Sequence, residues 1–354
     1  MRLESLSIKN FRNIEDEKIT TDNEMNVICG ENAQGKTNII EAIWLFTGAK
    51  SFRNCKDINF INLEKKKAKT KIDFLSGGVK NTAEMEFCEK RTAYLNSKEL
   101  KNTSLLAGNF NAVIFSPVDL NLINGAPIER RKFLDLSIGQ LYPKYIEILK
   151  NYKRALIQRN KIIKDFKYDA SLSVMLEVFE NELYENGIKI IEYRKEFIKK
   201  LSFFIKDIYS GISCGKENIE IIYKLNCESD NLKKYLEEKR KEDMFSGTTS
   251  AGPHRDDIEF LINDKSVKNY GSQGQKRSTA LSLKLTLSKI LKEISGEYPI
   301  CLLDDVMSEL DKNRQDYILN HIKDMQSFIT CCDPDNIKGL ERGKIFNIEK
   351  GRII

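Results

Sequence analysis

The chain has 354 residues, of which 41% are hydrophobic and 31% charged, and this balance excludes a mini-protein, a fibrous chain and a disordered one. At roughly 150 residues per domain, the length predicts two or three domains. No run approaches the roughly 18 apolar residues of a membrane span, so we expect a cytoplasmic protein, and the net charge of +6 permits a polyanionic partner without requiring one.

The first third of the chain predicts strands around one early helix. Residues 1–8 alternate as a strand, and the apolar run 25–29 is a second strand that ends at a glycine turn. A helix is predicted over 36–47. Period-two segments between 68 and 100 predict antiparallel strands, and residues 113–115 predict one more.

The middle of the chain changes to a helical pattern. Apolar residues recur at three-four spacing over about 127–166, and a second stripe follows over 172–208. A short polar turn near Tyr168 and Asp169 joins the two stripes. The simplest packing is an antiparallel helical hairpin, and an ordinary helical bundle is the alternative.

The last third returns to alternating strands and helices. We predict strands at 219–225, 258–262, 299–303, 327–331 and 344–348, and helices at 230–243, 272–294 and 311–322. One α/β domain is therefore split in sequence by a helical insertion. The predicted parts are residues 1–117 and 249–354 for the two halves of the α/β domain and 118–248 for the helical arm.

A phosphate-binding loop is predicted between the strand at 25–29 and the helix at 36–47. The pattern GxxxxGK[ST] is formed by Gly30, Glu31, Asn32, Ala33, Gln34, Gly35, Lys36 and Thr37. Backbone N–H groups of such a loop surround phosphates, Lys36 neutralises the β and γ oxygens, and the Thr37 hydroxyl contributes to a Mg²⁺ shell. An incidental glycine turn is the alternative.

Two carboxylates follow the buried strand at 299–303. We predict that Asp304 holds Mg²⁺ and that Asp305 polarises the water that attacks the γ-phosphate. A solvated turn after an apolar strand is the alternative. The phosphate loop elsewhere in the chain favours the catalytic interpretation.

A third motif precedes the helix at 272–294. Ser272, Gly274 and Gln275 resemble the LSGGQ signature of ABC-type ATPases, in which a serine and a helix N-terminus approach the γ-phosphate held by a second subunit. An ordinary serine N-cap is the alternative. Ser308 to Asp311 stand where such ATPases carry the D-loop, which reaches across the same dimer.

The order of these motifs resembles the ABC-type ATPase heads of the SMC and RecF group. Finer motifs resemble the RecF family: residues 10–13 (NFRN), 115–117 (FSP), 130–135 (RRKFLD), 252–257 (GPHRDD) and 303–311 (LDDVMSELD). These motifs extend from residue 10 to residue 311, so the resemblance covers essentially the whole chain.

The resemblance implies a fold and a function. The fold is α/β: an ABC-type ATPase head, with a phosphate-loop sheet and antiparallel strands, that carries an inserted helical hairpin arm. The implied cofactors are ATP and Mg²⁺, and the implied partners are double-stranded and gapped, partly single-stranded DNA, the proteins RecO and RecR, and a second copy of the chain. The implied activity is an ATP-induced dimer that clamps DNA and promotes RecA loading in recombinational gap repair, with no membrane partner.

Two departures from the general ABC pattern predict slow hydrolysis. Asp305 is one methylene shorter than the usual glutamate, and the strand at 328–332 carries no histidine. A non-catalytic scaffold that binds ATP and acts through protein partners is therefore the alternative function. No glutamine is evident for the Q-loop.

Basic residues suggest where DNA binds. Residues 126–167 hold eleven basic and four acidic side chains, whereas 168–187 hold none basic and five acidic. Phosphates would favour the first segment or the head surface through contacts that do not read bases. The cluster Lys65–Lys67 is a second candidate, and a solvated face is the alternative for both.

Several single residues have two interpretations. Arg12 follows the first strand, where related heads place a basic residue near the phosphates; a surface arginine is the alternative. A structural loop histidine is favoured for His254. The eight cysteines lack metal or disulfide spacing and are predicted to be reduced and mostly buried, including Cys331 and Cys332 in a strand.

Overall fold

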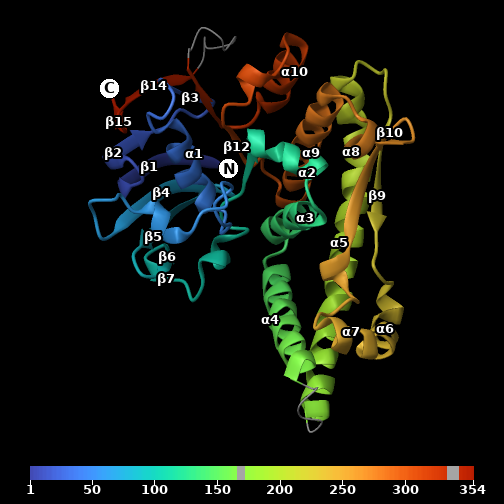
Figure 1. Ribbon diagram of the computed structural model, residues 1–354. Coiled ribbons are helices and arrows are strands. Elements are labelled where there is room, and N and C mark those ends of the chain that lie inside the picture. Colours follow the sequence, from blue (N-terminus) through green and yellow to red (C-terminus); the bar gives the residue numbers. More distant parts are fainter. Residues whose placement is uncertain (166–171, 333–342) are drawn as a thin grey trace. The chain divides into compact units, whose positions relative to one another are not determined.

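The computed structural model describes residues 1–165, 172–332 and 343–354, and these fall into two compact units. The first unit comprises residues 1–120, 207–216 and 277–354, and the second comprises 121–206 and 217–276. Figure 1 traces both units along the chain. The boundaries predicted after residues 117 and 248 stay predictions.

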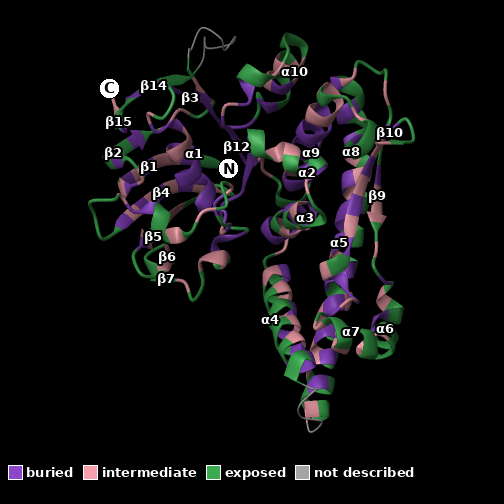
Figure 2. Cartoon of the chain, in the orientation of Figure 1, coloured by how far each residue is buried: buried purple, intermediate pink, exposed green. Residues whose placement is uncertain are grey.

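The first unit contains a mainly parallel six-stranded sheet in the order β15-β14-β3-β13-β12-β8. Its strands are β3 (Met25–Cys29), β8 (Ala112–Phe115), β12 (Ile300–Leu303), β13 (Ser327–Cys331), β14 (Lys344–Glu349) and β15 (Arg352–Ile353). The pairs from β14 to β8 are parallel, and β15 pairs antiparallel with β14. Every residue of β8 and β12 is buried, as a parallel sheet covered on both faces requires (Figure 2).

An antiparallel sheet of six strands completes the first unit, in the order β2-β1-β4-β5-β6-β7. Its strands are β1 (Arg2–Phe11), β2 (Ile14–Thr20), β4 (Ala68–Ser76), β5 (Val79–Phe87), β6 (Arg91–Leu95) and β7 (Lys98–Glu99). The alternation predicted for 68–100 is realised in β4, whose side chains are buried at every second position from Ala68 to Phe74.

One hydrophobic core joins the two sheets through α1 (Lys36–Leu45). Ile39, Ile40 and Ile43 of α1 are fully buried and share this core with strand residues such as Leu6 and Leu302. The phosphate-loop segment is therefore fixed from behind by packed apolar side chains. A second helix of this unit, α10 (Lys312–Ile322), follows β12.

The second unit is largely helical and carries a small antiparallel sheet in the order β11-β10-β9. Its helices and strands are α2 (Asn121–Asn124), α3 (Pro127–Leu141), α4 (Pro143–Asp165), α6 (Leu232–Glu238), α7 (Arg240–Ser246), α8 (Val267–Tyr270), β9 (Ile219–Lys224), β10 (Asp257–Ile262) and β11 (Lys265–Ser266). The long helices α5 (Ser173–Ile212) and α9 (Gln273–Ser295) each contain residues assigned to both units. No helix among the described residues is long and apolar enough to cross a membrane.

Two helix predictions in this unit were wrong. The stripe at 127–166 is two helices, because Tyr142 leaves the helical conformation and Pro143, which has no backbone N–H to donate, begins α4. The helix predicted at 230–243 is also interrupted and forms α6 and α7. The predicted turn at Tyr168 and Asp169 lies outside the described residues, although α4 and α5 pack together through Ile163 and Leu176.

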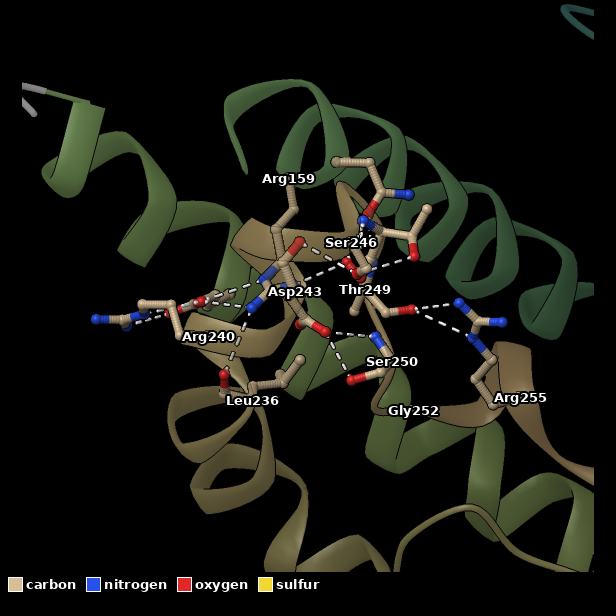
Figure 3. A network of polar contacts seen from close by, with 12 residues as sticks. Arg159, Leu236, Arg240, Asp243, Ser246, Thr249, Ser250, Gly252 and Arg255 are labelled. Atoms are coloured by element: carbon tan, nitrogen blue, oxygen red, sulfur yellow. Dashed lines mark hydrogen bonds and ion pairs between the residues drawn. The ribbon is translucent and has the colours of Figure 1, made fainter. Parts of the chain in front are cut away.

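A buried ionic network ties α4, α5 and α7 together (Figure 3). The guanidinium of Arg159, fully buried, donates to Glu180 at 2.9 Å, to Asp243 at 2.7 Å and to the Thr249 hydroxyl at 2.9 Å. Asp243 also accepts from the Ser250 hydroxyl at 2.6 Å. Because each buried charge has a partner of opposite sign, the network holds the loop after α7 in one conformation.

The prediction that the cysteines are mostly buried was wrong. All eight are free thiols, as predicted, but the structure buries only Cys29, Cys227 and Cys301. Cys332 is exposed because it lies beyond the end of β13, and the other exposed or half-buried thiols are Cys55, Cys88, Cys214 and Cys331.

Candidate nucleotide site

The predicted phosphate loop and carboxylates meet at one edge of the parallel sheet. Strands β3, β13 and β12 are neighbours, with Cys29 paired to Cys331 and Ile329 paired to Leu303. Their carboxyl ends therefore lie side by side. The loop of residues 30–37 leaves from the first of these strands, and Asp304 and Asp305 follow the third.

The loop backbone requires glycine at two positions. Gly35 has φ +120°, and an added Cβ there would lie 2.9 Å from the Asn13 Oδ1 atom. At Gly30 an added Cβ would lie 2.4 Å from the carbonyl oxygen of Ile348. A side chain at either position would collide with its neighbour, so the motif's glycines are needed for the path of the loop itself.

Lys36 is buried at the start of α1 and turns back over the loop. Its ammonium donates to the carbonyl oxygens of Gly30 at 2.6 Å and Glu31 at 3.0 Å. Glu31, Asn32 and Ala33 are exposed, whereas Gln34 is half-buried and its carbonyl accepts from Asn13 at 2.9 Å. The arrangement keeps one positive charge inside a loop whose tip is open to solvent.

The two acidic residues have different surroundings. Asp304 Oδ1 accepts from the Thr37 hydroxyl at 2.9 Å and lies 3.2 Å from the Thr330 hydroxyl. Burial, and after it the negative charge of Asp305, raises the pKa of Asp304 to about 6, although the hydrogen bond from Thr37 acts to lower it. Asp305 has φ +53°, a left-handed conformation that Asp tolerates, and its backbone N–H donates to Thr330 at 2.8 Å.

The residues present fit a magnesium ion. Thr37 and Asp304 offer a hydroxyl and a carboxylate oxygen 2.9 Å apart, and hard oxygen donors of this kind are what Mg²⁺ takes from proteins. These two residues would hold the ion, which supplies charge neutralisation to a bound triphosphate.

Arg12 contacts a buried carboxylate that sequence reasoning missed. Its Nη2 donates to Glu41 Oε2 at 2.8 Å, and its Nε donates to the same oxygen at 3.1 Å. Glu41 is fully buried on α1 and also accepts from the Ser51 hydroxyl. Arg12 has φ +57°, and its guanidinium lies 5.2 Å from the centre of the Phe60 ring. The signal in the sequence was a charged residue on the otherwise apolar buried face of the helix.

The signature-like residues form a helix cap in the single chain. The Ser272 hydroxyl accepts from the Gln275 backbone N–H at 3.2 Å, and the Gln275 side chain accepts from the Ser272 backbone N–H at 2.7 Å. This reciprocal pair is a capping box, with Gly274 in the first turn of α9. The serine N-cap, which was the alternative to the ABC signature, is therefore present. The residues belong to the second unit, and their part in a nucleotide site stays a prediction.

The predicted D-loop residues also have local partners. Ser308 donates to the Asp305 carbonyl at 3.2 Å, and Asp311 caps α10 by accepting from the Arg314 backbone N–H at 3.1 Å. Both side chains belong to exposed residues.

His254 is held as a structural residue in the second unit. Its Nδ1 lies 2.6 Å from the Tyr152 hydroxyl, and its Nε2 lies 2.9 Å from the Thr249 carbonyl. Burial lowers the pKa of His254 to about 4, so the ring is neutral near pH 7. Nε2 then donates to the carbonyl, and Nδ1 accepts from the tyrosine.

Comparison with known proteins identifies the family of this chain. Residues 2–351 match the family model described as "RecF/RecN/SMC N terminal domain". The chain is 41% identical to the DNA replication and repair protein RecF of Clostridium kluyveri and 38% identical to that of Lachnospira eligens, over 100% of this chain and 99% of each relative. The chain belongs to the RecF family. The resemblance stated from the motifs is thus confirmed.

Solved structures of similar proteins confirm the fold class. A structure of the recombination mediator protein RecF-ATPrS in the RecFOR pathway has a TM-score of 0.92 and 35% identity, covering 99% of this chain and 97% of the other. The Smc head domain of Pyrococcus furiosus has a TM-score of 0.56 at 19% identity and supports the fold alone. The ABC-type ATPase head predicted for this RecF-family chain is therefore the observed fold.

Proposed function

We propose that this protein is an ATP-dependent DNA-binding protein of recombinational gap repair. ATP with Mg²⁺ binds at residues 30–37 and Asp304, two copies of the chain close around two nucleotides, and the closed dimer clamps DNA. One observation carries the proposal: at one edge of the parallel sheet, the Thr37 hydroxyl of the phosphate loop donates to the carboxylate of Asp304.

Nucleotide binding is supported by chemistry and by relatives. Lys36 is already positioned over the loop by two carbonyl oxygens, which phosphate oxygens would replace as stronger acceptors for an ammonium. Structures described as RecF-ATP and RecF-ATPrS match this chain at a TM-score of 0.92. We extend their nucleotide to this chain.

Hydrolysis is proposed to be slow. Asp305 would orient the attacking water, but its carboxylate is one methylene short and Thr330 lies 3.3 Å from its Oδ1. A scaffold that binds ATP without turnover is the second candidate, favoured by the same short side chain. Phosphate release stimulated by DNA and abolished by Asp305→Asn would support the enzyme, whereas no release above a Lys36→Ala background would support the scaffold.

The cellular role is extended from the relatives' names. They are called DNA replication and repair proteins and are placed in the RecFOR pathway, so we propose that this protein acts in the cytoplasm with RecO and RecR to promote RecA loading at gaps. Double-stranded and gapped DNA would contact basic residues within 126–167 through phosphates. Retention of a gapped duplex by wild-type protein, with ATP and without it, tests the DNA part directly.

A further inference from the structure

The second unit contains a cavity that the proposed nucleotide site does not use. Its volume is about 260 Å³, and it lies among α3, α4, α5 and the turn at residues 253–255. Five of its lining residues are aliphatic or proline (Ile128, Leu149, Leu156, Ile190 and Pro253), and the rings of Tyr152 and His254 line it as well. A pocket of this size with apolar walls is large enough for an apolar amino-acid side chain.

Positive charge gathers in the same pocket. Arg131, Lys132, Lys153 and Arg194 line it, against one carboxylate, that of Asp135. Asp135 is already engaged, because its Oδ1 accepts from Arg194 at 2.8 Å and from the Tyr145 hydroxyl at 2.6 Å, and its Oδ2 lies 3.9 Å from the Lys153 ammonium. The lining therefore carries an excess of cations over anions.

Two of these cations lack acceptors for part of their donor capacity. Arg131 donates to the backbone carbonyl of Asp256 at 2.7 Å, and in the part of the chain that the structure describes no carboxylate forms an ion pair with it. Burial lowers the pKa of Arg131, and the nearby charge of Arg194 lowers it further. The Nε of Arg194 is buried and has no hydrogen-bond partner among the described residues. An incoming anion would offset the cost of burying the Arg131 charge without a carboxylate partner.

The pocket is held open before any ligand arrives. The turn that supplies Pro253 follows the loop fixed by Arg159 and Asp243, and Figure 3 shows the Arg255 guanidinium folded back onto the Thr249 carbonyl. Arg194 donates to the Pro253 carbonyl at 2.7 Å and so ties the turn to α5. A preformed site loses little entropy on binding.

We propose that this pocket binds an acidic segment of a protein partner, with an apolar side chain seated between the walls and an adjacent carboxylate facing Arg131 and Lys153. A nucleobase fits less well, because its edge needs acceptors as well as donors and the one carboxylate in the lining is taken. The proposal is independent of the nucleotide site.

The test is fluorescence anisotropy with full-length protein and three labelled peptides. The first is Asp-Asp-Glu-Asp-Leu-Leu, the second has serine in place of both leucines, and the third is Lys-Lys-Arg-Lys-Leu-Leu. We expect saturable binding of the first peptide, at least about tenfold weaker binding of the other two, and a loss of about tenfold in Arg131→Gln and Lys153→Gln. Lys161→Gln is the matched control, because Lys161 is exposed on the same helix as Lys153 and does not line the pocket. It should bind as the wild type does.

Two outcomes would overturn the proposal. One is the absence of saturable binding of the first peptide to wild-type protein. The other is a loss confined to nucleic acid: if Lys153→Gln and Arg131→Gln weaken binding of a labelled 20-base-pair duplex and leave the peptide unaffected, the pocket serves DNA phosphates instead. Circular dichroism of each variant establishes that it is folded; Lys153 is exposed, and its substitution removes one long ion pair, of 3.9 Å, with Asp135.

Discussion

The hydroxyl of Thr37 and the carboxylate of Asp304 lie 2.9 Å apart although 267 positions separate them in the chain. Thr37 lies in the first turn of α1, and Asp304 follows β12, which is two strands away from β3 in the parallel sheet. Neighbouring carboxyl ends of β3, β13 and β12 bring them together, and this pairing creates the oxygen donors of the candidate magnesium site.

Removing the carboxylate should make nucleotide binding independent of magnesium. For Asp304→Asn we expect the affinity for a fluorescent ATP analogue to fall by at least about tenfold with Mg²⁺ and to change little in EDTA, because a neutral amide neutralises no cation. Asp316→Asn, exposed on α10, is the control and should behave as the wild type. Equal losses with and without Mg²⁺ would contradict the assignment of Asp304 to the ion.

Arg12 should matter for stability because Glu41 cannot reach water. Arg12→Ala leaves a fully buried carboxylate with the Ser51 hydroxyl and the weakly donating Cys55 thiol as its remaining side-chain donors, and we expect a loss of about 3 kcal/mol in the free energy of unfolding. Arg2→Ala removes an exposed arginine on β1, the strand that precedes Arg12, and should cost less than about 0.5 kcal/mol. Urea unfolding followed by circular dichroism measures both, and similar values for the two variants would show that the Glu41 pair is not a structural clamp.

The buried arginine of the second unit gives a similar contrast. Arg159→Met leaves Asp243 and Glu180 buried with fewer donors, so we expect a loss of about 3–5 kcal/mol. Arg154→Met breaks an exposed pair with Glu182, at 3.4 Å, and should cost about 0.5 kcal/mol or less. If the urea midpoint of Arg159→Met matched that of Arg154→Met, the buried network would not stabilise the folded protein.

The pH dependence of stability should reveal His254. Its pKa is about 4 in the folded protein and about 6.5 when exposed, so the unfolded chain takes up a proton first as the pH falls. The contribution of His254 to the free energy of unfolding is therefore fully present above about pH 6.5. As the pH falls from about 6.5 to 4, the free energy of unfolding decreases by up to about 3 kcal/mol. Thermal unfolding of wild type and His254→Gln should converge over that range; a constant gap between the two curves would contradict a neutral, buried ring.

The sequence predicted the parts of the site that are local. A strand, a glycine loop and a helix are encoded within residues 25–47, and the apolar run before Asp304 needs no distant partner to be recognised. Glu41 was missed because its partner, Arg12, comes from the turn after β1, 29 positions earlier in the chain, and a single sequence does not say which residue will neutralise a buried charge. The same holds for Arg159, whose side-chain partners lie on α5, α7 and the following loop.

Errors in the fold came from periodicity that continues across a break. The apolar stripe runs from α3 into α4 without interruption, so the spacing alone hid the change at Tyr142, although Pro143 was the signal for it. Ser272 illustrates a different ambiguity: a capping box and a nucleotide signature use the same residue types at the start of a helix. Within one chain, the Ser272–Gln275 hydrogen bonds form the helix cap. Whether Ser272 also approaches a nucleotide held by a second chain is a question for experiment.

Complementation in the analytical ultracentrifuge tests the central claim, that two chains share each nucleotide site. Lys36→Ala and Ser272→Arg are mixed with ATP and Mg²⁺; each homodimer lacks both sites, whereas a mixed dimer retains one site made of the Lys36 of one chain and the Ser272 of the other. We predict that each variant alone sediments as a monomer and that the equimolar mixture yields a one-to-one dimer. Wild-type protein that stays monomeric in saturating ATP, or variants that do not rescue each other, would contradict the shared site.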